Sequence, residues 1–455
     1  MQGFFLFIYS KRMNGLQPID TLIEAKWIIP VEPAGIALNR HAIIIDKGII
    51  RDILPVSEAR LRYQSRQTIT LTDHVLIPGL INLHTHAAMT LMRGLADDLP
   101  LMEWLHQHIW PVENRHVNAQ FVLDGAQLAC AEMIKGGITC FNDMYFFPES
   151  CAQAAISSGM RAAVGMLVID FQTAYASDAD DYLAKGLQLC DQYQHPLLSF
   201  CFAPHAPYTV SDKTFRSILI YAEQLNVPIH THLHETQDEI RLSLQSWGAR
   251  PIERFQELGL LIPNLIAVHM THLSDHEIKL VHQYGCHIAH CPSSNMKLAS
   301  GLAPIAPLLN QGVNVGLGTD GAASNNRLDM FEEMRLAALL AKATSGQADA
   351  LPAHQALQMA TLNGAKALGL AEITGSLTIG KAADITAINF SGLNLTPCYD
   401  PASHLVYTAS REQVSHVWVN GKMLLQDKAL TTLNPVELQY RAAYWHERIA
   451  ATSQH

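Results

Sequence analysis

The chain reads Pro-Gly-Leu-Ile-Asn-Leu-His-Thr-His from Pro78 to His86, which is a turn signal followed by a short apolar run and two histidines. The apolar part has the length and composition of a buried β-strand. Because the side chains of a strand alternate between its two faces, His84 and His86 would project from the same face. Two imidazoles on one face form a preorganised pair of metal ligands, although such a pair standing alone is more often accidental.

Seven more apolar runs of strand length follow this one, and longer helix-like stretches separate them. This alternation is typical of repeated strand and helix units. Eight units over about 290 residues favour an α/β fold of the closed (β/α)8 TIM-barrel type, with a doubly wound sheet as the alternative. The eight expected strands are residues 80–83, 139–142, 162–167, 198–202, 227–230, 265–268, 287–290 and 313–317.

Polar side chains end several of the later runs. The fifth run continues through His232 to Glu235, the sixth is followed by His269, and the eighth is followed by Asp320. Because the active sites of such barrels lie at the carboxyl ends of the strands, these endings would converge on one mouth. Each residue alone could be a polar group that caps the barrel rim. Together with the histidine pair, the set indicates an active site.

The composition excludes several classes of protein. With 455 residues, 49% of them hydrophobic and 16% charged, the chain is too apolar for disorder and long enough for a large barrel with an accessory domain. A net charge of −10 without a run of lysines or arginines gives no electrostatic footprint for a nucleic-acid polymer or an anionic membrane. The eight cysteines form no Cys-x-x-Cys pair, which indicates free thiols in a reducing, cytoplasmic compartment.

Short β-rich runs occur at both ends of the chain, in residues 21–77 and again in residues 383–388 and 416–422. We therefore expect one small β-sandwich domain formed by both chain ends and closed by a final helix near residues 436–451. Residues 1–12 contain an apolar stretch too short for a membrane span and no cleavage site, so we interpret them as an upstream-start extension. The expected division is 13–78 and 373–435 for the β-sandwich, 79–372 for the barrel, and 436–455 for the C-terminal helix and tail.

These motifs resemble those of the amidohydrolase superfamily, in the cytosine-deaminase-like branch that includes chlorohydrolases and adenosine-type deaminases. The resemblance covers nearly the whole chain, from the motif at residues 78–86 to the segment at residues 375–384. It implies a metal-dependent hydrolytic deaminase on a TIM barrel. The alternative from another class is a non-catalytic relative that keeps the barrel as a scaffold. Such a protein usually lacks the metal ligands, whereas the matched positions are all filled here.

Carried over position by position, the resemblance implies that His84 and His86 bind a metal ion together with His232 and Asp320. Two-metal members of the superfamily need a bridging ligand, usually a carboxylated lysine at the fourth strand, and residues 202–205 contain no lysine. The resemblance therefore implies a single divalent ion. Imidazoles with one carboxylate suit Zn²⁺ best, and Fe²⁺ or Mn²⁺ is also compatible.

The resemblance also implies roles in catalysis. Glu235, three residues after His232, matches the glutamate that shuttles protons, and His269 matches the histidine that orients the attacking water. Asp320 would take a proton from that water, and Glu235 would donate one to the substrate ring. The competing positions nearby are His230, His234 and His272.

Residues 93–105 resemble the corresponding stretch of the 5′-methylthioadenosine/S-adenosylhomocysteine deaminase family. The resemblance implies that Glu103 binds the ribose hydroxyls of a small purine nucleoside and that His205 contacts its purine, beside Glu235 and Asp320. The alternatives are a solvated helix residue for Glu103 and a rim histidine for His205. Residues 291–301 also resemble the family, and we expect them to form a wall of the pocket.

The same family uses arginines to bind the amino-acid carboxylate of S-adenosylhomocysteine, and only Arg161 is a loose candidate here, one that could equally be structural. We therefore expect 5′-methylthioadenosine to be preferred over S-adenosylhomocysteine. Within the enzyme class, the alternative is a deaminase or hydrolase of another heterocycle, such as guanine, an oxidised guanine, a triazine or adenosine itself. The sequence leaves the oligomeric state open, a homo-oligomer included.

Overall fold

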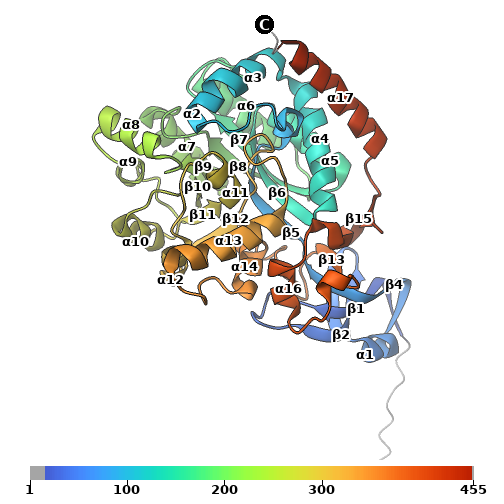
Figure 1. Ribbon diagram of the computed structural model, residues 1–455. Helices are drawn as coiled ribbons and strands as arrows, with labels where there is room; N and C mark the ends of the chain where they lie inside the picture. The colour runs from blue at the N-terminus through green and yellow to red at the C-terminus, as the bar shows by residue number, and fades with distance from the viewer. Residues whose placement is uncertain (1–15, 453–455) are drawn as a thin grey trace, which may run out of the picture.

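The computed structural model describes residues 16–452, so the interpretation of residues 1–12 lies outside the described residues. Figure 1 shows a barrel surrounded by helices, with strands from the two ends of the chain gathered at its base. Among residues 16–452, no helix is long and apolar enough to cross a membrane.

The barrel is an eight-stranded parallel sheet in which each strand neighbours the one before it in sequence. All eight strands expected from the sequence are confirmed, with ends that differ by up to three residues. They are β5 (Leu80–Thr85), β6 (Ile138–Tyr145), β7 (Arg161–Val168), β8 (Leu198–Pro204), β9 (Ile229–Leu233), β10 (Leu265–His269), β11 (His287–His290) and β12 (Asn314–Leu317).

The barrel closes where β5 meets the residues that follow β12. Asn82 in β5 accepts a hydrogen bond from the Thr319 backbone N–H at 2.9 Å, and its own amide donates to Thr319 Oγ1 at 2.7 Å. The backbone N–H of Asp320 donates to His84 O at 3.0 Å. Gly318 permits this close approach, because a Cβ there would lie only 2.8 Å from the Cβ of His84. This closure rules out the doubly wound alternative.

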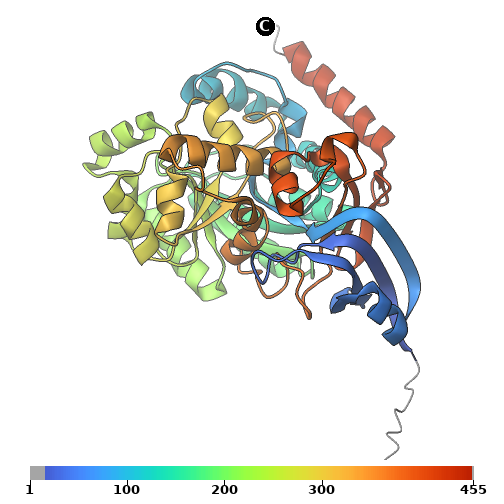
Figure 2. The ribbon, with the colours of Figure 1, turned by 60° about the horizontal axis from the view of Figure 1, so that its bottom comes forward.

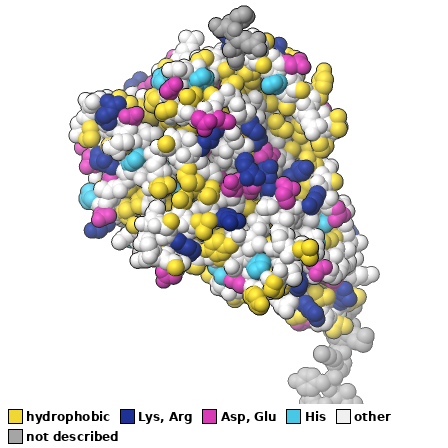
Figure 3. All heavy atoms as spheres, in the orientation of Figure 1, with side chains coloured by type: hydrophobic (Ala, Val, Ile, Leu, Met, Phe, Trp, Pro, Cys, Tyr) yellow, Lys and Arg dark blue, Asp and Glu magenta, His cyan; other side chains and the backbone are white. Residues whose placement is uncertain are grey.

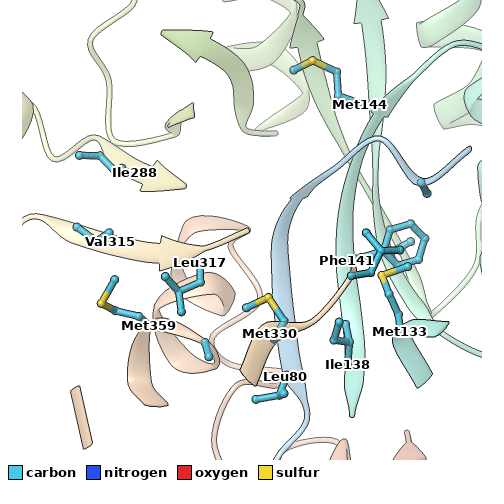
Figure 4. Close-up of a cluster of buried hydrophobic side chains, with 14 of the residues drawn as sticks. Leu80, Met133, Ile138, Phe141, Met144, Ile288, Val315, Leu317, Met330 and Met359 are labelled. Carbon is cyan, nitrogen blue, oxygen red and sulfur yellow. The ribbon is translucent and has the colours of Figure 1, made fainter. Parts of the chain in front are cut away.

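Apolar side chains fill the space between the strands and the surrounding helices. Figure 4 shows part of this core, where Phe141 and Leu317 from the strands lie in a cluster with methionines from neighbouring helices. Those methionines are Met133 in α4 (Ala119–Lys135), Met330 in α13 (Met330–Ser345) and Met359 in α14 (Ala353–Met359), and all are fully buried. Burial of this apolar surface stabilises the barrel.

Polar N-cap residues begin several helices of the outer layer. Asn118 accepts hydrogen bonds from two backbone N–H groups of the first turn of α4, and Ser211 accepts one at the start of α7 (Asp212–Leu225). The other helices between and after the strands are α5 (Pro148–Ser158), α6 (Ala179–Gln192), α8 (Gln237–Trp247), α9 (Pro251–Leu258), α10 (Asp275–Gln283), α11 (Pro292–Lys297), α12 (Ile305–Asn310), α15 (Leu362–Ala367) and α16 (Pro401–Tyr407).

A longer connection joins β5 to β6 and contributes residues to the barrel mouth. It contains a 3-10 helix (Ala87–Met92), the short α2 (Leu101–Glu103), a π-helical turn (Trp104–Ile109) and α3 (Trp110–His116).

The second sheet has eight strands, with the order β16-β15-β14-β13-β4-β1-β2-β3. Its two halves come from opposite ends of the chain and join where β4 pairs antiparallel with β13. Figure 2 shows these strands side by side at the base of the barrel, which confirms the expected small domain formed by both chain ends. Its elements are β1 (Gln17–Ile28), β2 (Leu38–Asp46), β3 (Ile49–Pro55), α1 (Val56–Arg62), β4 (Tyr63–Pro78), β13 (Ile385–Asn389), β14 (Val414–Val419), β15 (Lys422–Gln426) and β16 (Ala429–Leu430).

The final helix forms as expected, as α17 (Pro435–Thr452), but the prediction that it closes the β-domain is wrong. It runs along the barrel beside α4, as Figure 1 shows. The Trp445 indole packs on Phe121 with ring centroids 5.0 Å apart, and its N–H donates to Asp124 at 2.9 Å. The apolar face of α17 therefore covers the barrel helix.

The outer surface carries both signs of charge. On the face drawn in Figure 3, lysines and arginines are interspersed with aspartates and glutamates, and no extended basic stripe is visible.

Arg161 lies at the amino-terminal end of β7, the end opposite the strand endings that carry the predicted active site. Its Nε donates to Asp384 Oδ2 at 3.0 Å, and the two side chains are 4% and 0% exposed. Asp384 also accepts from the backbone N–H of Asn420 at 2.7 Å. Arg161 therefore joins the barrel to the β-domain, and the structural interpretation of this residue holds.

Replacing Arg161 by Met should lower the free energy of unfolding by about 3–5 kcal/mol, because Asp384 would remain buried without its partner. Urea denaturation followed by circular dichroism measures the change. Arg241→Met is the matched control, since Arg241 pairs with Asp238 and the two side chains are 57% and 61% exposed. That variant should lose less than about 1 kcal/mol. Equal losses in the two variants would contradict the assignment.

Candidate active site

Four predicted metal ligands meet at the carboxyl end of the barrel. His84 Nε2 lies 3.2 Å from His232 Nε2 and 3.3 Å from Asp320 Oδ1, and His86 Nε2 lies 3.2 Å from the same carboxylate oxygen. The residues come from β5, from the position just after it, from β9 and from the loop after β12. Nitrogen and oxygen donors that converge in this way suit a divalent cation. The set fits the single-ion site that the resemblance implies.

The other ring nitrogens of these histidines are already held. His86 Nδ1 bonds to Met144 O at 2.5 Å, and His232 Nδ1 bonds to His205 O at 2.7 Å. Because a carbonyl oxygen only accepts, each Nδ1 carries the proton and each Nε2 presents its lone pair to the centre. His84 Nδ1 bonds to His230 Nε2 at 3.0 Å. Such outer contacts fix ring orientation and raise the basicity of a ligand.

The competing histidines face away from this centre. His230 lies behind His84, and His234 accepts from the backbone N–H of Ile252 at 3.1 Å. His272 Nε2 bonds to Ser300 O at 2.7 Å. Each of the three thus uses at least one ring nitrogen to support a neighbouring ring, helix or loop.

A cavity of about 170 Å³ opens above the cluster. His86, His232 and Asp320 lie among the residues at its floor, with Glu235 and His269 beside them. Among the described residues, no lysine or arginine lines this cavity. The walls are mainly apolar and aromatic, with contributions from Leu101, Trp104, Leu105, Ile109, Trp110, Phe146, Leu167, Ile169 and Phe171.

Glu235 and His269 lie within reach of each other on the cavity floor. Glu235 Oε2 is 3.7 Å from His269 Nε2, and Ser300 Oγ donates to Glu235 Oε1 at 3.4 Å. Burial raises the pKa of the Glu235 carboxyl, so it holds a proton at higher pH than an exposed glutamate does. A carboxyl of this kind is suited to donate a proton to a bound substrate.

Asp320 is held in a strained backbone conformation. Its φ is 63°, in the left-handed region that residues other than glycine rarely adopt. Ser294 Oγ donates to Asp320 Oδ2 at 2.6 Å, and the Gly321 N–H donates to Oδ1 at 2.7 Å. These two bonds fix the carboxylate of Asp320 in place.

The two predicted substrate-binding residues differ in where they lie. His205 lines the cavity and its Nδ1 bonds to Thr209 Oγ1 at 3.0 Å, while burial lowers the pKa of its ring to about 3. Glu103 is exposed and is not among the residues that line the cavity. Its neighbour Trp104 does line the cavity.

Sequence reasoning missed three buried polar residues at the site. Glu113 in α3 lines the cavity and accepts from the Tyr145 hydroxyl at 2.7 Å, and burial raises its pKa to about 7. No local pattern distinguishes Glu113 from a solvated helix residue. Ser294 and Asn295 lie in the loop that we expected to form a wall, and the run Cys-Pro-Ser-Ser-Asn directly after a strand was the available signal.

Comparisons with known proteins agree with this geometry. The model of the amidohydrolase family matches residues 75–424. A 5-methylthioadenosine/S-adenosylhomocysteine deaminase from Teredinibacter turnerae is 49% identical over 440 residues, which are 96% of this chain and 100% of the relative. A 5′-deoxyadenosine deaminase from Methanosarcina mazei is 39% identical over 435 residues, with 95% and 99% covered. The crystal structure of an adenosine deaminase from Xanthomonas campestris with bound zinc is 46% identical, has a TM-score of 0.95, and is matched over 96% of this chain and 100% of that chain.

The geometry predicts that the purified chain holds about one divalent metal ion, since four donor side chains converge on one place. Replacing His232 by Ala should remove most of the bound metal, as measured by inductively coupled plasma mass spectrometry after dialysis. His276→Ala is the matched control, because His276 is exposed on α10. Retention of metal by His232→Ala at the level of the control would contradict the proposed ligand set.

Proposed function

The chain belongs to the amidohydrolase family, and we propose that it hydrolytically deaminates adenosine-type nucleosides to the inosine-type product and ammonia. The observation that carries this proposal is the meeting of Glu235, His269 and Asp320 on the floor of an apolar cavity. Apolar and aromatic walls suit a planar heterocycle, and the groups on the floor can move protons. Relatives named for adenosine-type substrates cover almost the full length of the chain.

The metal is best assigned as zinc, held by His84, His86, His232 and Asp320. Imidazole nitrogens and one carboxylate oxygen are favoured zinc donors, and the 46% identical structure contains bound zinc. Fe²⁺ or Mn²⁺ remains compatible with this donor set. When bound, such a cation supplies a water that loses a proton at about pH 7.

Asp320 accepts a proton from the attacking water as its oxygen adds to the ring carbon that bears the amino group. Glu235, whose pKa is raised by burial, donates a proton to the adjacent ring nitrogen, which prevents negative charge from building up on the ring. The proton taken by Asp320 then passes to the amino group, so ammonia leaves rather than an amide anion. The remaining hydroxyl proton returns to Glu235 as the carbonyl of the product forms. His269 holds the attacking water in line with the ring carbon.

His205 and Glu103 are our proposals for recognition of the nucleoside. His205 lines the cavity beside His232, with ring centroids 5.1 Å apart, and can hydrogen-bond the purine. Glu103 would accept two hydrogen bonds from the vicinal ribose hydroxyls, for which a carboxylate is suited. Because Glu103 is exposed beside the cavity-lining Trp104, its side chain would turn inward when the ribose enters.

The cavity favours an uncharged 5′ substituent. S-Adenosylhomocysteine carries an amino-acid carboxylate, and a buried carboxylate needs a cationic or hydrogen-bonding partner. None of the described residues lining the cavity is a lysine or arginine, and Arg161 is bound to Asp384 at the other end of β7. The thioether of 5′-methylthioadenosine matches the apolar walls instead. We therefore propose 5′-methylthioadenosine as the preferred substrate.

The eight cysteines are all free thiols, which supports the proposal of a reducing, cytoplasmic compartment. The other heterocycles that the sequence left open, guanine and triazines among them, give no reason for a ribose-binding carboxylate at Glu103. The scaffold alternative fails to explain why the metal-binding and proton-transfer positions are all filled and convergent.

Metal-loaded enzyme should release ammonia from adenosine analogues, and Glu235→Gln should lower kcat by about 10²–10⁴ because the proton donor is lost. A coupled assay for ammonia measures the rate, and metal analysis should show unchanged occupancy. Glu257→Gln, an exposed glutamate of α9, is the control and should match the wild type. An inactive wild type with full metal, or an unimpaired Glu235→Gln, would contradict the proposal.

The kcat/KM for 5′-methylthioadenosine should exceed that for S-adenosylhomocysteine by about 10-fold or more, since one unpaired polar group costs at least that much. 5′-Deoxyadenosine, which also lacks a charge at this position, should behave like 5′-methylthioadenosine. Steady-state rates from the fall in adenine absorbance measure all three. Comparable kcat/KM values for the charged and uncharged substrates would overturn the selectivity proposal.

A further inference from the structure

The first turn of α11 places two consecutive side chains against the active-site floor. Ser294 Oγ donates to Asp320 Oδ2 at 2.6 Å, and Asn295 Oδ1 lies 2.8 Å from His269 Nδ1. The turn is anchored from behind, because the backbone N–H of Ser293 donates to the buried Glu333 at 3.1 Å. Two groups that face the attacking water are thus held by one short segment.

The contact between Asn295 and His269 selects one form of the imidazole. An amide oxygen only accepts hydrogen bonds, so His269 Nδ1 must carry a hydrogen. The Nε2 of a neutral ring then has a free lone pair, and this atom faces Glu235 at 3.7 Å. In such a pair, the hydrogen bond made by one ring nitrogen decides the role of the other.

The buried side chain of Asn295 bonds to the protein through its oxygen. Its side chain is 1% exposed, and its Nδ2 has no hydrogen-bond partner within the described protein. Both ring nitrogens of the buried His290 are likewise without one, and the two residues border a cavity of about 10 Å³. A buried polar side chain that bonds to a residue of the active-site floor is a candidate for a functional role.

The backbone around His269 does not fix the ring without help. His269 and Met270 both have positive φ, 74° and 51°, at the point where β10 ends. This bend directs the side chain of His269 toward the floor of the cavity. The bend does not prevent rotation of the imidazole about its side-chain bonds. The hydrogen bond from Nδ1 to Asn295 supplies that restriction.

We propose that Asn295 is a positioning residue that holds His269 with Nδ1 protonated and Nε2 turned toward the attacking water. This inference rests on the proposed deaminase function. Nε2 accepts one hydrogen of the water, and Asp320 accepts the other, so the oxygen lone pair points at the ring carbon. In the opposite tautomer, Nε2–H would donate to the oxygen and occupy the electron pair needed for attack.

Asn295→Leu tests this role, because it keeps the size of the side chain and removes the acceptor. We expect kcat to fall by about 10- to 100-fold, as for other residues that orient groups at a metal site, with KM changed by less than about twofold. Zinc content should stay at the wild-type level. The melting temperature should fall by no more than about 4 °C, because the variant leaves the buried Nδ1–H of His269 without its acceptor.

Asn295→Asp keeps an acceptor for His269 Nδ1 and should restore most of the rate that Asn295→Leu loses. Asn310→Leu is the matched control, since Asn310 is exposed at the end of α12, and it should be as active as the wild type. 5′-Methylthioadenosine is the substrate for all variants. Ammonia release, zinc content and thermal melting are measured on each.

Three results would overturn the inference. Asn295→Leu could keep its kcat, it could lose activity in proportion to lost zinc or lost stability, or Asn295→Asp could be as slow as Asn295→Leu. The failure of the proposed function is separate, because it would appear in the wild type as absent ammonia release. A fully active wild type with an unimpaired Asn295→Leu would overturn this inference alone.

Discussion

The active-site floor depends on the hydrogen-bonded seam between the first and last strands of the barrel. Asn82 and Thr319 are 237 residues apart in sequence and exchange two hydrogen bonds across this seam. The Asp320 N–H bonds to His84 O in the same place. A ligand pair from one strand and a carboxylate from another can meet around one ion only because the sheet closes there. The tight contact at Gly318 is part of the same constraint.

The histidines of the floor act as a set because their outer nitrogens are tied to the protein. Backbone carbonyls hold His86 and His232, His230 holds His84, and Asn295 holds His269. Each contact decides which nitrogen faces the cavity. The supporting residues come from other strands and loops than the rings they hold, so the orientation of every ring is a property of the barrel mouth as a whole.

The local sequence predicted the strands well because apolar runs of strand length, separated by helical stretches, have few other uses. The local sequence did not predict which buried surfaces pack against each other. The apolar face of α17 was recognisable, but nothing near Trp445 indicates that its partner would be Phe121 in α4. The sequence likewise did not predict that Glu103 is exposed while its neighbour Trp104 is buried. A local motif does not show which side of a helix faces the cavity.

The sequence by itself determined the barrel and the small domain from both chain ends, because these follow from periodicity. It also gave the candidate residues for metal binding and proton transfer, because the motifs at the strand ends carry a family resemblance that implies those roles. Only the tertiary structure decided that His230 supports a ring and does not face the centre, that Arg161 binds Asp384 far from the cavity, and that Asn295 touches His269. The physical reason is distance along the chain. Closure and packing of the barrel decide which side chains form hydrogen bonds with each other. Because these side chains are far apart in sequence, the local pattern does not predict the pairs.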